Sequence, residues 1–73
     1  MNGTVARIRR KGIEATLDGM PALNDTFQVH RVISSVDTVI WTGRVHRIKG
    51  DKIRINTDTF TVQPEVGDLV RSV

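Results

Sequence analysis

The sequence predicts an all-β protein, a small antiparallel β-barrel or sandwich of about six to seven short strands. Val, Ile and Thr occupy 25 of the 73 positions, against three Ala and three Leu, and this bias favours strands over helices. Apolar and polar residues alternate with period 2, and no stretch has the 3.6-residue period of an amphipathic helix. A chain of this length predicts a single domain, residues 1–73.

Turn signals divide this alternation into separate strands. The stretch Asp18-Gly19-Met20-Pro21 predicts a turn, and a short helical turn around residues 21–24 would fit before the next strand. The hairpin that follows Gly50-Asp51 is expected to pair residues 52–56 with residues 59–63. In chain order, strands are expected at residues 4–10, 13–18, 26–33, 38–47, 52–56, 59–63 and 69–73.

The period-2 pattern also predicts which side chains face the core, since alternate residues of a strand point to the same side. A chain this short buries only about 60% of its unfolded surface, which favours assembly with copies or partners. The expected core is Val5, Ile13, Ala15, Leu17, Phe27, Val29, Ile40, Val45, Ile53, Ile55, Phe60, Val62 and Leu69.

Two Gly-Asp pairs, Gly50-Asp51 and Gly67-Asp68, each precede an expected strand. Glycine accepts a positive φ, and an Asp side chain bonds to nearby backbone. Both glycines are therefore predicted to lie in turns whose backbone geometry other residues resist.

The sequence contains a candidate internal repeat. "GTVARIRRKGI" at residues 3–13 aligns with "GRVHRIKGDKI" at residues 43–53, and Asp18 aligns with Asp58. Each half then reaches a similar element, "LNDTFQV" or "VGDLVRSV". Two such halves predict a pseudo-symmetric barrel, although a strand-rich composition also produces matches of this kind by chance.

The charge is mildly basic, +3 with a pI of about 10.2, and residues 1–11 carry four cations and no acid. Basic clusters attract nucleic acid, anionic membrane surfaces or acidic protein faces. The alternative is a solvated edge strand protected from aggregation by its charges. The candidate binding residues flank two turns: Arg9, Arg10, Lys11, Lys49 and Lys52.

No pattern of catalytic or cofactor-binding residues is present, so we expect no enzyme, no cofactor and no metal site. Cysteine and tyrosine are absent, and no nucleophile elbow, P-loop or dinucleotide-binding motif occurs. His30 and His46 are two histidines without a third ligand at a defined spacing, which favours ordinary surface residues. No apolar run approaches the roughly 20 residues that span a bilayer, and no signal peptide is recognisable.

One hairpin pattern resembles a known family. Gly50-Asp51, Ile53 and Ile55, then Phe60, Val62 and Val66, are similar to the terminal hairpin of the head–tail joining, or neck connector, proteins of long-tailed bacteriophages, with the lambda-type joining protein as the model. "IEATLDGMP" at residues 13–21 is loosely similar to an earlier strand of that family. The likeness covers about half the chain, which is shorter than most joining proteins and lacks their N-terminal arm.

The resemblance implies a non-catalytic barrel that assembles as a ring between portal and tail, in the virion or, before assembly, in the cytoplasm. Its partners would be copies of itself or other structural proteins of the same assembly, with non-specific DNA contact possible and no membrane. Two other hypotheses stay open. One is a basic barrel that binds the phosphate backbone of nucleic acid, and the other is an accessory domain that binds a different protein in a larger machine.

Overall fold

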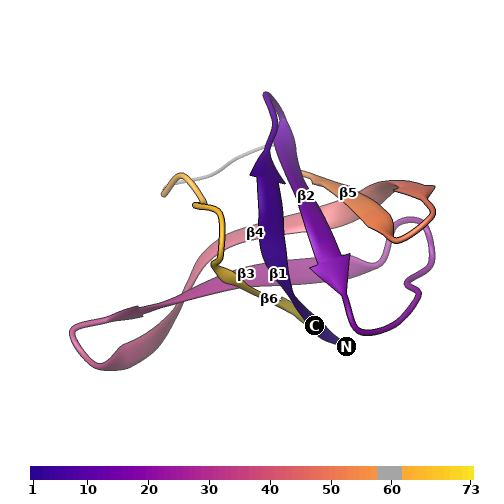
Figure 1. The fold of residues 1–73 in the computed structure, drawn as a ribbon. Helices are drawn as coiled ribbons and strands as arrows, with labels where there is room; N and C mark the ends of the chain where they lie inside the picture. The colour runs from indigo at the N-terminus through magenta and orange to yellow at the C-terminus, as the bar shows by residue number, and fades with distance from the viewer. Residues whose placement is uncertain (58–61) are drawn as a thin grey trace.

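The chain folds into a closed barrel of six antiparallel strands (Figure 1). The computed structural model describes residues 1–57 and 62–73. The strands are β1 (Asn2–Ile8), β2 (Gly12–Leu17), β3 (Thr26–Ile33), β4 (Val36–Lys49), β5 (Lys52–Asn56) and β6 (Leu69–Ser72). Around the barrel they follow the order β1-β2-β5-β4-β3-β6, and β6 closes onto β1.

The predicted all-β class is confirmed, and the architecture is a barrel rather than a sandwich. The expected strands at residues 26–33 and 52–56 have the bounds predicted. The turn at Gly50-Asp51 joins β4 to β5, and β5 pairs with β4 and β2. The expected partner strand at residues 59–63 falls mostly outside the described residues, and its described members, Val62 and Gln63, are not in a strand. The stretch at residues 21–24 holds a turn rather than helix.

The internal repeat appears in the structure as a pseudo-two-fold axis. Adding 40 to both residues of four of the five β1–β2 pairs gives four pairs of the β4–β5 register, and each pairing has a β-bulge at the corresponding position. Adding 43 to β3 gives β6, so the β3–β4 pairing maps onto β6–β1. Three pairs illustrate the first relation: Thr4↔Thr16 with Arg44↔Asn56, Val5↔Ala15 with Val45↔Ile55, and Ile8↔Ile13 with Ile48↔Ile53. The axis passes through the pair Glu14↔Arg54 on one wall and Gln28↔Arg71 on the opposite wall.

The turns that lead into β3 and β6 follow the same symmetry. In each, an Asp carboxylate accepts a hydrogen bond from the backbone three residues earlier: Ala22 N to Asp25 at 2.9 Å, and Glu65 N to Asp68 at 2.8 Å. The residue before each Asp has positive φ, 71° at Asn24 and 94° at Gly67. The prediction of positive φ at the Gly-Asp turns is therefore confirmed, since Gly50 also has φ 62°.

The core lies inside the barrel and matches most of the expected set. Nine of the thirteen expected residues are buried, and Leu17 packs against them in part. The prediction that Leu69 faces the core is wrong: Leu69 is 43% exposed, and its neighbour Val70 is buried. The predicted phase of this strand was off by one residue, and such a shift exchanges its inward and outward faces. Val62 is also exposed, and Phe60 lies outside the described residues. The buried Trp41 was missed, because the bulge in the β3–β4 pairing places it and Ile40 both in the core.

The β3–β4 hairpin extends well beyond the barrel, to the lower left of Figure 1. We call its projecting part, residues 31–39, the arm. The register of β6 on β3 stops at His30, and that of β5 on β4 stops at Arg44. Ser34 and Ser35, both with positive φ, form its two-residue turn. The pseudo-two-fold symmetry of the barrel does not extend to the arm.

Candidate functional site

The outer wall formed by β1, β2, β5 and β4 carries a row of charged side chains. Register places Arg7 beside Glu14, Glu14 beside Arg54 and Arg54 beside Arg47. Paired residues of neighbouring strands lie on the same face of a sheet, about 4.5–5.5 Å apart. Three arginines and one glutamate therefore form a continuous row across four strands, centred on the pseudo-two-fold axis.

The two β-bulges determine which residues join this row. Each bulge inserts one extra residue, Ala6 in β1 and His46 in β4, between an inward valine and an outward arginine. In a strand without a bulge, the residue after each inward valine would face outward in the row. Ala6 and His46 would then take the positions that Arg7 and Arg47 occupy. The repeated bulge thus places an outward arginine, Arg7 or Arg47, at the equivalent position of each half.

A hollow of about 390 Å³ lies on this wall. Two acidic side chains, Glu14 and Asp51, line it alongside five cationic ones. We call the following six residues the basic face, Arg7 and the five that line the hollow: Arg7, Arg9, Arg47, Lys49, Lys52 and Arg54.

One acid of the hollow is neutralised within the chain. The Arg9 guanidinium donates two hydrogen bonds to the same oxygen of Glu14, from Nε at 2.9 Å and from Nη2. The hydrogen bonds from Arg9 hold the pKa of Glu14 below its ordinary value, and the charges of Arg7 and Lys52 act in the same direction. Glu14 is therefore ionised at neutral pH, and Arg9 is engaged with it.

The remaining cations of the hollow have no acid partner in the described part of the chain. Arg47, Lys49, Lys52 and Arg54 form no ion pair there. The Nε of Arg54 is buried and has no hydrogen-bond partner among the described residues. A buried donor without a partner costs about 1–3 kcal/mol. An anion seated in the hollow would pair with these four charges.

The structure brings three of the five candidate binding residues together. Arg9, Lys49 and Lys52 line the same hollow. Arg10 and Lys11 lie in the β1–β2 turn and do not line it. Sequence reasoning missed Arg47 and Arg54, although the outward period-2 positions of β4 and β5 carry both.

The two histidines lie in other polar groupings. His30 Nδ1 lies 3.2 Å from Asp37, which also accepts a hydrogen bond from Arg71 at 3.1 Å. His46 lines a second hollow, of about 500 Å³, whose lining has one cation, Arg44, and no acid. Across residues 1–57 and 62–73, no three His, Asp or Glu side chains gather where they could hold a metal ion.

Comparison with protein-family models, curated proteins and solved structures gives no match for this chain. Within the residues that the structure describes, no helix has the length and apolar character needed to cross a lipid bilayer.

Proposed function

We propose that this protein is a non-catalytic structural subunit that acts by assembly, of the kind that forms the neck or tail of a virion. The resemblance of its hairpin sequence to phage joining proteins supports this role, and the six-stranded barrel is consistent with the fold which that resemblance implies. Such a protein would work in the virion or, before assembly, in the cytoplasm.

The observation that carries the proposal is the arm. Its apolar side chains are exposed on both faces: Val32 is 65% and Val39 45% exposed on one face, and Ile33 44% and Val36 61% on the other. A two-stranded hairpin is marginally stable alone in water. Apolar residues at a projecting tip gain stability only when something covers them, at about 25 cal/mol per Å² of apolar surface removed from water.

The first of these faces continues onto the barrel. Register places His30 between Val39 and Leu69, and Leu69 is 43% exposed. Among the described residues, the β4 edge of the arm has no neighbouring strand, since β5 begins to pair only at Arg44. An exposed apolar edge strand is a template for pairing with another chain.

We assign a second copy of this chain as the occupant. The barrel is small, and small domains commonly gain stability by oligomerisation. An arm that docks on a different surface of its neighbour makes a head-to-tail contact, and such contacts close into rings when the rotation between subunits permits. Another structural protein of the same assembly is the alternative occupant that the experiment distinguishes.

The test is the mass of the purified chain in solution, measured by sedimentation velocity over a concentration range. We expect an oligomer for the wild type and a monomer for Val32→Ser/Val36→Ser, with little change in melting temperature, since both side chains are exposed. The matched control is Val66→Ser/Val73→Ser, which removes two exposed valines outside the arm.

A wild-type chain that stays monomeric at 100 times the concentration of the lowest sample would contradict self-assembly. An oligomer that Val32→Ser/Val36→Ser leaves intact would show that the arm is not the contact.

A further inference from the structure

The basic face is separate from the arm and calls for a different ligand. Charge on the barrel is unevenly placed: six of the eleven Lys and Arg residues belong to the basic face, and only Glu14 and Asp51 oppose them there. Glu14 is already paired with Arg9. The surplus positive charge surrounds a hollow, where field lines concentrate and raise the local concentration of anions.

The chemistry of this wall favours a phosphate backbone over an acidic protein. Protein interfaces depend on buried apolar and aromatic anchors. The outward positions of β2 and β5 between the two turns are all polar or charged: Glu14, Thr16, Lys52, Arg54 and Asn56. Arginine guanidinium groups present a planar fork that matches phosphate oxygens in bidentate fashion.

The described residues offer no exposed aromatic side chain on which a base could stack, which favours a duplex over a single strand. Proteins that bind single strands combine a basic groove with aromatic platforms for the bases. The two aromatic residues in the described part of the chain, Phe27 and Trp41, are buried in the core. A wall whose described residues supply cations and no aromatic side chain is suited to the outside of a duplex, where phosphates are presented continuously.

We propose that the basic face binds the phosphate backbone of double-stranded DNA, independently of sequence, with Arg54 at the centre of the contact. Arg54 lies in the middle of the charged row, with Arg47 on one side and the paired Glu14 on the other. Phosphate oxygens accept from Arg54 and Arg47, and Lys49 and Lys52 contact the adjoining phosphates. This binding function goes beyond assembly through the arm and uses a different wall of the barrel.

Salt dependence gives the proposal a quantitative form. Each neutralised phosphate contributes about −0.9 to the slope of log affinity against log salt concentration on B-DNA. The four unpaired cations that line the hollow, Arg47, Lys49, Lys52 and Arg54, predict a slope of about −3.6 and an affinity that falls about 100-fold between 50 and 200 mM salt.

The experiment uses the whole chain and a labelled 20-base-pair duplex of mixed sequence, titrated by fluorescence anisotropy at several salt concentrations. Arg54→Gln is expected to reduce the slope by about 0.9, and Arg47→Gln/Arg54→Gln by about 1.8. Arg71→Gln is the matched control, because it removes the same charge on the opposite wall, also at the pseudo-two-fold axis. Arg54→Lys retains the charge and is expected to keep the slope.

Three results would overturn the proposal. The first is no measurable binding of the duplex at 50 mM salt by a folded wild-type chain. In the second, Arg71→Gln lowers the slope as much as Arg54→Gln, which would mean that only net charge matters. In the third, polyglutamate of matched charge displaces the duplex as well as unlabelled DNA does, which would identify a surface for acidic polypeptides. Melting curves of all variants confirm that each is folded.

Discussion

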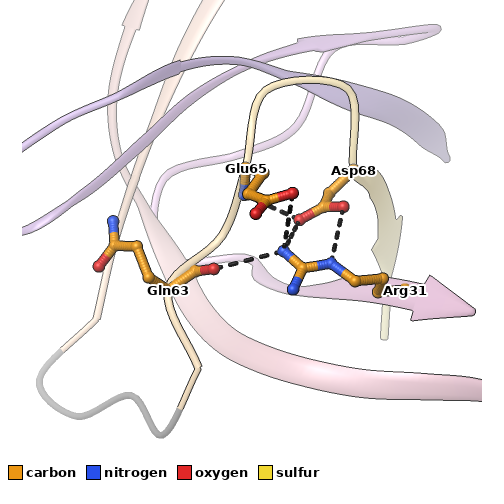
Figure 2. A network of polar contacts seen from close by, with 4 residues as sticks. All are labelled: Arg31, Gln63, Glu65 and Asp68. Atoms are coloured by element: carbon orange, nitrogen blue, oxygen red, sulfur yellow. Dashed lines mark hydrogen bonds and ion pairs between the residues drawn. The ribbon is translucent and has the colours of Figure 1, made fainter. Parts of the chain in front are cut away.

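Arg31 on β3 and Asp68 in the turn before β6 form a two-pronged ion pair between residues 37 positions apart in the chain (Figure 2). Arg31 Nε lies 3.2 Å from Asp68 Oδ1, and Nη2 lies 2.6 Å from Oδ2. Arg31 also donates to the Gln63 carbonyl oxygen at 3.3 Å. The base of the arm is thereby fixed to the loop that closes the barrel.

This ion pair is where the pseudo-symmetry of the barrel is broken. Asp25 and Asp68 hold their turns in the same way, but no ion pair involves Asp25 in the described residues, whereas Asp68 also accepts from Arg31. The asymmetric contact occurs at the base of the arm, the hairpin that extends beyond the barrel. We therefore expect it to orient the arm.

Removing the charge of Asp68 should cost more than the same change in its symmetric counterpart. We expect Asp68→Asn to lower the free energy of unfolding by about 1–2 kcal/mol, since hydrogen bonds to a charged group weaken. Asp25→Asn keeps an acceptor for its turn and loses no ion pair, so its cost should be smaller. Chemical denaturation of the two variants measures the difference, and equal losses would mean that the ion pair adds nothing to the turn.

The same pair predicts a pH dependence of stability. Hydrogen bonds from Arg31 hold the pKa of Asp68 below its ordinary value, against the opposing effect of burial. A carboxyl whose folded pKa is lowered stabilises the fold above its unfolded pKa, about 3.9, and that stabilisation is lost as pH falls through the folded pKa. Arg31→Met should therefore melt below the wild type at pH 6, and the two melting temperatures should converge as pH falls below about 4. A gap that persists at pH 2 would assign the effect of Arg31 to packing instead.

Symmetry also predicts which residues are tolerated at position 67, in the turn before β6. Gly67 has φ 94° and open space around its missing side chain, so the cost of substitution is conformational rather than steric crowding. Its counterpart is Asn24, which has φ 71°. Gly67→Asn should be tolerated, whereas Gly67→Val should destabilise by about 1–2 kcal/mol or more and exceed Asp68→Asn, because a β-branched residue resists positive φ. Thermal melting of the three variants gives the order, and a stable Gly67→Val would show that the turn adapts to ordinary backbone angles.

Local patterns in the sequence predict much of this fold. Period-2 alternation locates β3 and β5 to the residue, and the repeat at residues 3–13 and 43–53 indicates the symmetry that the hydrogen-bond register displays. The errors lie where a strand changes phase. Val70 rather than Leu69 faces the core, and the bulge in β3–β4 buries Trp41 beside Ile40. Alternation within one strand cannot determine its phase, because the neighbouring strands set it.

The candidate site was predicted only in part for a similar reason. Arg9, Lys49 and Lys52 were singled out because they flank turns, but Arg47 and Arg54 join them through pairing across three strands. Arg10 and Lys11 are close to Arg9 in sequence but do not line the hollow. Which charges share a wall depends on strand order, and sequence alone does not supply that order.

Glu14, the acid that pairs with Arg9, is expected to weaken DNA binding by the basic face. Glu14 holds Arg9 and places a negative charge beside Arg54, so it opposes phosphate binding in two ways. Glu14→Gln removes that repulsion, which at about 7 Å in water corresponds to about a threefold gain in affinity. It also releases Arg9 to a phosphate, so the salt slope should steepen by about 0.9.

Asp51→Asn is the matched control: Asp51 forms no ion pair in the described residues, so its removal should raise affinity without steepening the slope. Anisotropy titrations of both variants at 50 to 200 mM salt measure the two quantities. Equal slopes for Glu14→Gln and the wild type would mean that Arg9 does not reach the DNA even when it is released.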